Sequence, residues 1–258
     1  MANEMFAIQN LSFAYGKHPV LHGLNLSLQE GSITTLIGAN GCGKSTLFQL
    51  MTKNLKSNQG TIQFRGENIT SMRLKDFAKE VAIVHQYNSA PADLTVEKLV
   101  GYGRTPHHTL GMSADPQLDE EKVRWAMDIT NTTKYRDKPV AELSGGQKQR
   151  VWIAMALAQD TKVLFLDEPT TYLDVRYQLQ ILRLIQKLNR ECSISIVMVL
   201  HDINQSLYYS DEIVAMKGGR IIAQGEPEQI MTRDLIQEVY QVDLSIREVD
   251  GKPFVIPL

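Results

Sequence analysis

Apolar positions in the N-terminal part of the chain recur with the two-residue period of β-strands. Residues 24–28 alternate apolar and polar side chains, and residues 60–66 form a second alternating run bounded by glycines. Residues 6–8 and 11–13 are shorter strand-like runs, whereas residues 33–37 are apolar or β-branched throughout. Alternation predicts a strand with one buried face, and an unbroken run predicts a strand buried on both faces. We therefore expect a β-rich N-terminal part with residues 33–37 inside a sheet.

Three later apolar runs predict buried strands, and each ends in polar side chains: residues 81–84 before Gln86, residues 163–166 before Asp167 and Glu168, and residues 193–200 before His201. In open α/β sheets, ligands bind at the carboxyl ends of the parallel strands. These four polar side chains are therefore candidates for a ligand site at that edge. Asp167 and Glu168 are the stronger signal, because two carboxylates at the end of an apolar strand do not stabilise it.

The region between residues 87 and 160 follows the helical period instead. Residues 117–130 repeat apolar positions on one face, and residues 148–159 are apolar on most sides, which predicts a buried helix. The buried face predicted for the first of these helices consists of Val123, Ala126, Met127 and Thr130. We therefore expect a helical insertion at about residues 87–160 in an α/β protein.

Two adjacent histidines, His107 and His108, lie in a loop predicted over residues 101–116 from its glycine and proline content. Histidine is a common metal ligand, but no third ligand is evident near this pair. The favoured interpretation is a surface loop rather than a metal site.

The C-terminal part returns to mixed structure. Residues 177–189 carry an apolar helical stripe, and residues 213–224 predict a hairpin that turns at Gly218 and Gly219. Residues 227–240 predict two short helices, and residues 245–258 are strand-like with loops. The order of elements predicts an α/β protein.

Composition limits the class of protein. The chain has 258 residues, a net charge of −2 and a sequence pI near 6.3, which argues against a nucleic acid as the main partner. It has two cysteines, far apart in sequence, so a disulfide framework is not expected and a reducing compartment fits. The most apolar stretch, residues 194–200, is far short of the roughly 20 residues of a membrane-spanning helix. Residues 1–10 lack the pattern of a signal peptide.

The chemical signal with the clearest pattern is the segment from Gly38 to Thr46, which matches the phosphate-loop motif G-x-x-x-x-G-K-[ST]. It follows the strand predicted at residues 33–37 and precedes a helix predicted to start near Lys44. Glycines let backbone amides wrap a phosphate, and the helix N-terminus adds partial positive charge. Lys44 would reach the β- and γ-phosphates of a nucleotide, and the Ser45 hydroxyl would hold Mg²⁺.

A second anion cradle is predicted at residues 143–147, Leu-Ser-Gly-Gly-Gln, where Ser144 can cap the helix that follows. Beside a bound Mg²⁺–nucleotide, Asp167 can hold the ion through its water shell, and Glu168 can orient and deprotonate an attacking water. Tyr15 lies in a predicted turn. It is either a surface aromatic or a flat ring on which an adenine stacks.

These motifs, in this order, resemble the ATP-binding cassette (ABC) transporter ATPases over essentially the whole chain. The resemblance is specific, because LSGGQ between two nucleotide motifs is peculiar to that family. It implies one cassette over residues 1–258: a P-loop NTPase core with a parallel sheet, an N-terminal antiparallel β-subdomain and an inserted helical subdomain at about residues 87–160. It also implies ATP and Mg²⁺ as ligands.

The resemblance assigns a role to each motif residue. Tyr15 stacks on adenine; Glu168 is the general base, and Gln86 senses Mg²⁺ and water. His201 contacts the γ-phosphate, and Asp174 lies at the subunit interface. The residues implied to bind phosphates are Gly38, Asn40, Gly41, Cys42, Gly43, Lys44, Ser45 and Thr46. Those implied to contact the γ-phosphate of an ATP on the other subunit are Ser144, Gly145, Gly146 and Gln147. The metal residues are Ser45, Gln86 and Asp167.

Two partners follow from the same resemblance. A second copy of the chain pairs head to tail with the first over two ATP molecules, and integral membrane permease subunits use this motion at the cytoplasmic face of the membrane. A substrate-binding protein acts only indirectly. We further expect residues 87–107 to form the groove in which a permease loop helix docks.

Four softer segments, residues 99–107, 152–159, 170–174 and 198–205, are similar to the ATPases of iron–siderophore, haem and cobalamin importers. Ferric siderophores are the commonest substrates of that subfamily, so siderophore import is the main expectation, with haem or cobalamin import as the alternative. Two other classes of protein with a phosphate loop are less favoured. An ABC ATPase acting on nucleic acid would carry long coiled-coil insertions or two cassettes, and a P-loop kinase would lack LSGGQ.

One cysteine lies inside the phosphate loop. Near a helix N-terminus the pKa of a thiol tends to fall, so one hypothesis is that alkylation of Cys42 blocks ATP binding and that ATP protects it. The alternative is an inert small residue.

Overall fold

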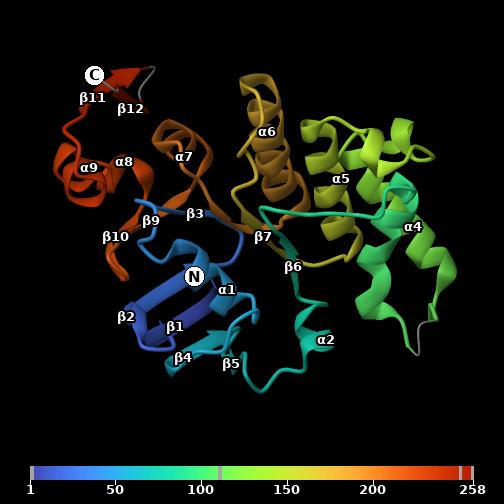
Figure 1. The fold of residues 1–258 in the computed structure, drawn as a ribbon, viewed down its shortest axis with the longest axis horizontal. Helices are drawn as coiled ribbons and strands as arrows, with labels where there is room; N and C mark the ends of the chain where they lie inside the picture. The colour runs from blue at the N-terminus through green and yellow to red at the C-terminus, as the bar shows by residue number, and fades with distance from the viewer. Residues whose placement is uncertain (1–2, 110–111, 250–251, 257–258) are drawn as a thin grey trace. The chain divides into compact units, whose positions relative to one another are not determined.

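The computed structural model of the protein describes residues 3–109, 112–249 and 252–256. The chain divides into two compact units (Figure 1). The first unit combines residues 1–72 with residues 195–258, and the second comprises residues 73–194. Among the described residues, none of the helices combines the length and apolar character needed to cross a bilayer.

An antiparallel sheet forms the N-terminal part of the first unit. Its strands are β1 (Glu4–Tyr15), β2 (His18–Gln29), β4 (Gln59–Phe64) and β5 (Glu67–Asn68), in the order β2-β1-β4-β5. The two strand-like runs expected at residues 6–8 and 11–13 belong to one strand. Asn10 between them has a positive φ of 50°, and the pairing with β2 shifts register between Ile8 and Leu11. The apparent gap in the pattern is therefore a β-bulge.

A mostly parallel sheet completes the first unit. β3 (Ile33–Gly38) pairs in parallel with both β8 (Ser195–Val199) and β9 (Glu212–Lys217), and β10 (Arg220–Gly225) forms an antiparallel hairpin with β9. All residues of β3 and β8 are buried, as the unbroken apolar runs predict. Helix α1 (Lys44–Met51) follows β3, and α7 (Ile203–Tyr209) follows β8. The helix expected to start near Lys44 is confirmed.

The C-terminal segment packs onto the strand that leads to the phosphate loop. It consists of α8 (Pro227–Ile230), α9 (Arg233–Tyr240), β11 (Ser245–Val249) and β12 (Lys252–Ile256). Ile236 and Val239 of α9 are buried with Ile37 of β3 in one apolar cluster. The two short helices are confirmed, and so is strand structure after residue 245. Residues 250–251 and 257–258 of that prediction lie outside the described residues.

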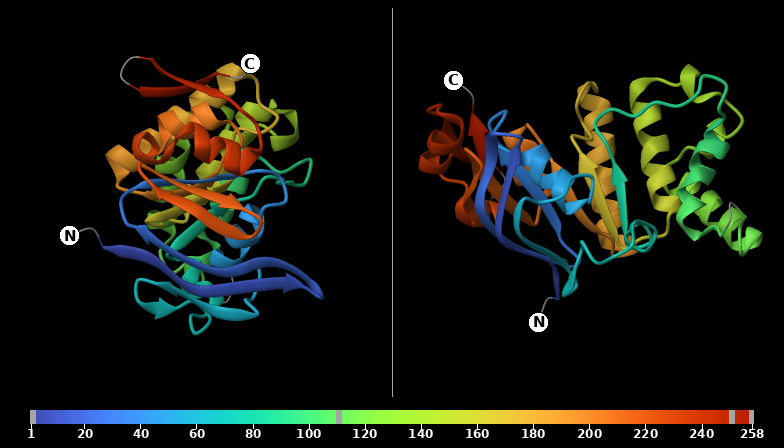
Figure 2. Two further views of the ribbon diagram at one scale, coloured as in Figure 1. Left: turned by 90° about the vertical axis from the view of Figure 1, so that its left-hand side faces the viewer. Right: turned by 60° about the horizontal axis from the view of Figure 1, so that its bottom comes forward.

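The second unit is mainly helical (Figure 2). Its strands, β6 (Val81–Val84) and β7 (Val163–Asp167), pair in parallel. Its α-helices are α2 (Leu74–Phe77), α3 (Val96–Gly101), α4 (Pro116–Ile129), α5 (Gly145–Ala158) and α6 (Val175–Cys192). The described part of this unit also contains the 3₁₀ helices η1 (Tyr102–His107), η2 (Thr133–Tyr135) and η3 (Val140–Glu142). Helices α3 and α4 pack against α5.

The predicted buried face of α4 is confirmed, since Val123, Ala126, Met127 and Thr130 are all buried. Helix α5 begins at Gly145 rather than at Lys148, because Ser144 and Gln147 form a capping box that starts the helix despite two glycines. Residues 101–116 are not a loop throughout, since residues 102–107 form η1. Residues 110–111 of that prediction lie outside the described residues.

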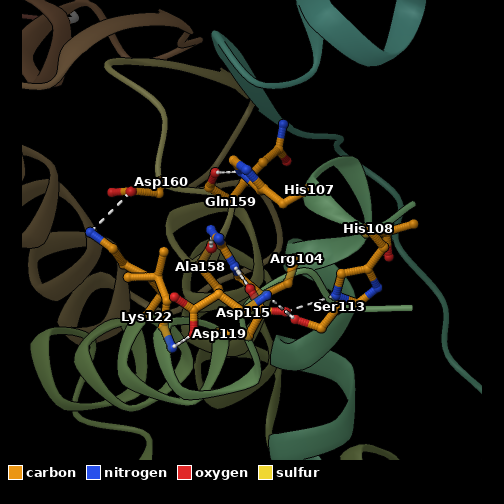
Figure 3. A network of polar contacts seen from close by, with 12 residues as sticks. Arg104, His107, His108, Ser113, Asp115, Asp119, Lys122, Ala158, Gln159 and Asp160 are labelled. Carbon is orange, nitrogen blue, oxygen red and sulfur yellow. Dashed lines mark hydrogen bonds and ion pairs between the residues drawn. The ribbon is translucent and has the colours of Figure 1, made fainter. Parts of the chain in front are cut away.

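The two adjacent histidines belong to a polar network inside the helical unit (Figure 3). Arg104 is buried and donates to Asp119 Oδ1 at 2.7 Å and to the Ala158 carbonyl at 2.8 Å. His108 Nε2 lies 2.8 Å from Asp119 Oδ2, and His107 Nε2 lies 2.8 Å from the Gln159 carbonyl. Both histidines are half-buried. Among the described residues, no group of three or more histidine, cysteine, aspartate or glutamate side chains is placed to hold a metal ion. Through these two contacts the histidines join their segment to α4 and to the residue that follows α5.

Candidate functional site

The phosphate loop has a backbone that only glycine can adopt at its key positions. Gly38 has φ 148° and Gly43 has φ 110°. A Cβ at Gly38 would lie 2.3 Å from the Met216 carbonyl oxygen, and one at Gly43 would lie 2.7 Å from Leu21 Cδ2. Both approaches are too close for a real side chain. The loop is thus held against β9 and β2 at distances that only glycine permits.

Lys44 places its charge inside this loop. The residue is 5% exposed, and its ammonium donates to the carbonyls of Gly38 at 2.7 Å and Ala39 at 3.1 Å. Lys44 is also the first residue of α1, whose N-cap, Gly43, contributes no side-chain hydrogen bond. A buried cation beside an uncapped helix N-terminus is a donor set that suits a phosphate group. The residues present therefore fit a nucleotide phosphate.

Other members of the loop differ in accessibility. Asn40, Gly41 and Ser45 are exposed, and Thr46 is 8% exposed. Cys42 is 6% exposed, and its Sγ lies 3.9 Å from Lys44 Nζ. Alkylation of a thiol this buried requires the loop to open, so we expect slow modification. The hypothesis that ATP protects Cys42 stays a prediction.

Two more candidate residues lie in the first unit. Tyr15 ends β1, is 47% exposed and presents its ring at 86° to Phe13, with 4.8 Å between ring centroids. This leaves a ring accessible for stacking. His201 is exposed just beyond β8, where the amide of Leu200 donates to the Leu36 carbonyl of β3 at 3.4 Å. Because Gly38 ends β3, the first unit brings His201 to the same end of the sheet as the phosphate loop.

Gln86 and Glu168 meet in the second unit, as expected for residues that follow neighbouring strands. Gln86 Nε2 donates to Glu168 Oε2 at 2.5 Å, and Thr171 Oγ1 donates to the same oxygen at 3.0 Å. Glu168 has a positive φ of 50°, which is rare for a residue with a side chain and is favoured where function fixes the backbone. Asp167, the last residue of β7, is half-buried next to it.

The signature segment and Asp174 mark two helix N-termini. The Ser144 amide donates to Gln147 Oε1 at 3.0 Å, and Gln147 Nε2 donates to the Tyr135 hydroxyl at 3.0 Å. Asp174 caps α6 by accepting from the Tyr177 amide at 3.0 Å. A Cβ at Gly146 would lie 2.3 Å from Tyr177 Cδ1, so α5 and α6 touch within the signature, in the first turn of α5.

The structure thus sorts the predicted residues into two sets. The phosphate loop, Tyr15 and His201 belong to the first unit, and Gln86, the signature, Asp167, Glu168 and Asp174 belong to the second. The pattern of the sequence did not identify the supporting side chains: Tyr135, Thr171 and Tyr177. Their contacts span up to 31 residues, as between Gly146 and Tyr177, and no periodicity encodes them.

Comparison with known proteins agrees with these motifs. A model of the ABC transporter family matches residues 21–171. The iron(3+)-hydroxamate import ATP-binding protein FhuC of Bacillus subtilis (strain 168) is 44% identical over 238 residues, which cover 92% of this chain and 88% of that protein. The ferric enterobactin transport ATP-binding protein FepC of Escherichia coli (strain K12) is 40% identical, over 97% of this chain and 93% of the relative.

A solved structure supports the same assignment at the level of the fold. A chain from the inward-facing conformation of a transporter assigned to the metal-chelate ABC type superposes with a TM-score of 0.86 at 26% identity, and the match covers 99% of this chain and 98% of that one. The family model spans more than half of the sequence, and both relatives align with more than nine tenths of it. This chain therefore belongs to the ABC transporter family, as one of its ATP-hydrolysing cassettes.

Proposed function

We propose that this chain powers a membrane importer of ferric siderophores. The observation that carries the proposal is the identity of about 40% to FhuC and FepC over nearly the whole chain, because both are named for the import or transport of ferric siderophore-type chelates. The petrobactin import ATP-binding protein FpuC of Bacillus anthracis, 39% identical over 98% of this chain, adds a third relative of the same kind. Import of haem or cobalamin is the alternative cargo.

In this proposal the phosphate loop binds the triphosphate of ATP. Lys44 exchanges the carbonyls of Gly38 and Ala39 for phosphate oxygens, because a charged acceptor bonds an ammonium more strongly than a carbonyl does. The amides of residues 38–46 donate to the same phosphates, and Tyr15 stacks on the adenine. His201 donates to the terminal phosphate. The fit of the glycine backbone to an anion supports these roles.

Hydrolysis is assigned to the second set of residues. Glu168 accepts a proton from a water whose oxygen bonds to the terminal phosphorus, while the bond to the leaving ADP oxygen breaks. Gln86 donates to the Glu168 carboxylate and orients it toward that water. Ser45, Gln86 and Asp167 are the residues that would hold Mg²⁺, which supplies positive charge to the phosphates when bound.

The proposal includes two partners and a location. A second copy of the chain contributes Ser144, Gly145, Gly146 and Gln147 to the ATP of the first, with Asp174 at the contact between the copies. Permease subunits dock on residues 87–107, which places the chain on the cytoplasmic face of the membrane as a peripheral protein. One chain carries a single phosphate loop and a single signature, which supports pairing.

Replacing the proposed base tests the chemical assignment. We expect Glu168→Gln to lower kcat for ATP hydrolysis by about 10²–10⁴-fold, because it removes the proton acceptor. ATP affinity, measured by equilibrium binding of a fluorescent analogue, should stay within a few-fold. Glu142→Gln, at an exposed carboxylate of the same unit, is the matched control and should keep full activity. Near-normal turnover of Glu168→Gln would reassign the base.

Transport in proteoliposomes tests the cargo. The chain is reconstituted with a permease and binding protein encoded beside it, and uptake of radiolabelled ferric hydroxamate, ferric catecholate, haem and cobalamin is compared. We expect ATP-dependent uptake of a ferric chelate that Glu168→Gln abolishes. Uptake of haem or cobalamin alone would select the alternative, and failure of the chain to bind any permease would contradict the importer assignment.

A further inference from the structure

Two exposed tyrosines meet directly beside the proposed base. Tyr87 follows Gln86 in the chain and is 71% exposed, and Tyr172 follows Thr171 and is 80% exposed. Their hydroxyl oxygens lie 3.0 Å apart, and their ring centroids are 6.2 Å apart. They are 85 residues apart in sequence. Water could satisfy both exposed hydroxyls, so burial does not require this contact.

Each tyrosine is joined by one peptide bond to a residue that donates to Glu168. Gln86 Nε2 and Thr171 Oγ1 both donate to Glu168 Oε2, at 2.5 Å and 3.0 Å. The Thr171 amide also donates to the Glu168 carbonyl at 3.2 Å. The loop after β6 and the loop after β7 are therefore joined twice, once through the carboxylate and once through the hydroxyl pair. Two adjacent links restrict the loops more than either link alone.

The backbone of the second loop is under local constraint. Tyr172 has a positive φ of 62°, and Glu168 has one of 50°. Non-glycine residues in this region persist only where surrounding contacts fix them.

We propose that Tyr87 and Tyr172 form a positioning pair that holds Gln86 on the carboxylate of Glu168 and so keeps the base oriented for hydrolysis. This inference rests on the proposed role of Glu168. Neither tyrosine is assigned contact with ATP; both act through the residue that precedes them. The pair spans the loops that follow β6 and β7, so its loss should affect the chemical step and leave nucleotide binding unchanged.

Kinetics of the phenylalanine variants test the pair, because each removes one hydroxyl and keeps the ring. Tyr87→Phe and Tyr172→Phe should each lower kcat about two- to tenfold, the range expected for the loss of one exposed hydrogen bond, with KM for ATP unchanged within twofold. If the hydroxyls act as one unit, the double variant should be no slower than either single variant. Tyr208→Phe, at a 56% exposed tyrosine of α7, is the control. An unchanged kcat, or losses that multiply in the double variant, would overturn the pairing.

The side-chain amide of Gln86 gives a readout independent of hydrolysis. In protein labelled with ¹⁵N-glutamine, its resonance is assigned by its loss in Gln86→Ala. Glu168→Ala should move this resonance to the position of an unbound amide, and Tyr172→Phe should move it part of the way. A resonance that moves in Glu168→Ala but not in Tyr172→Phe would refute the positioning role, and one that moves in neither would refute the Gln86–Glu168 bond. If the resonance moved in both variants but Glu168→Gln still hydrolysed ATP at a near-normal rate, the role of Glu168 as the base would be wrong and the positioning pair would stand.

Discussion

At the scale of single residues, the candidate site depends on places where even a methyl group does not fit. In the phosphate loop, a Cβ at Gly38 would collide with Met216 of β9, and one at Gly43 with Leu21 of β2. In the signature, a Cβ at Gly146 would collide with Tyr177. The adjacent Gly145 differs, since a Cβ there would lie 3.6 Å from Leu173 Cδ2, which is ordinary contact. Two consecutive glycines in one motif therefore serve different purposes. One allows two helices to touch, and packing does not require the other.

This difference gives a matched pair of variants. Gly146→Ala should lower the free energy of unfolding by about 1–3 kcal/mol, because Tyr177 and α6 must shift to admit the methyl group. Gly145→Ala should be neutral or stabilising by up to about 1 kcal/mol, because alanine favours the helix more than glycine does. Urea unfolding followed by circular dichroism measures both. Equal losses in the two variants would show that the contact with Tyr177 is not what selects glycine at position 146.

At the scale of elements, the helical unit is held by Asp119 of α4, which binds groups from η1 and from the segment before α4. Burial raises the pKa of this carboxyl, but hydrogen bonds from Ser113, Arg104 and His108 outweigh that effect and lower the pKa to about 2. Arg104 also bonds the last residue of α5 through the Ala158 carbonyl. Asp119 and Arg104 therefore join three helical elements, and the ionised form of the carboxylate stabilises the fold.

The pH dependence of stability follows from the direction of that shift. A carboxyl whose pKa is lower in the folded state than in the unfolded state stabilises the fold above the unfolded value, near 4, and loses this contribution as pH falls to about 2. The stability of the wild type relative to Asp119→Asn should therefore be constant between pH 7 and 5 and shrink by about 1 kcal/mol at pH 3. Urea unfolding at each pH measures this.

Glu120→Gln is the control for Asp119→Asn. Glu120 is 71% exposed and pairs with Arg124 on the surface of α4, where an ion pair contributes little. Its effect on stability should stay within about 0.5 kcal/mol at every pH. If Asp119→Asn behaved like Glu120→Gln, the network in Figure 3 would not stabilise the unit.

Elements whose signal is local could be predicted from the sequence. The unbroken apolar runs at residues 33–37 and 163–166 predict strands buried on both faces, and both are strands whose apolar residues are buried. The N-cap predicted at Ser144 is confirmed, although the helix already begins at the glycines before its apolar run. The short helix α7 at residues 203–209 was not predicted, because its seven residues show little apolar period. Its N-cap, Asp202, accepts from the Gln205 amide at 2.9 Å.

Contacts between distant residues could not be predicted in the same way. Gln86 and Glu168 were expected near each other, because both follow parallel strands whose carboxyl ends lie at the same edge of a sheet. The contact between the hydroxyls of Tyr87 and Tyr172 was not expected, because it depends on the conformation of two loops. The ion pair between Arg104 and Asp119 likewise depends on how η1 packs on α4. Periodicity identifies which face of an element is buried, and tertiary packing decides which polar side chains meet.

At the scale of the whole molecule, the assigned residues fall into two sets carried by two compact units. The phosphate loop in one unit leads into a helix without a side-chain cap, and the signature in the other begins a helix whose N-terminus carries the capping box of Ser144 and Gln147. The proposed function requires that the signature of one copy act on the nucleotide of another. ATP binding and self-association are then linked, so ATP should favour the dimer.

The most direct test of this claim is the mass of the Glu168→Gln protein in solution, measured by size-exclusion chromatography with light scattering. The variant keeps ATP bound because it lacks the proposed base. With Mg²⁺ and ATP it should elute with about twice the chain mass of 29.1 kDa, and as a monomer without nucleotide or when Ser144→Arg is added. A monomer at saturating ATP, with ATP binding confirmed, would contradict the account.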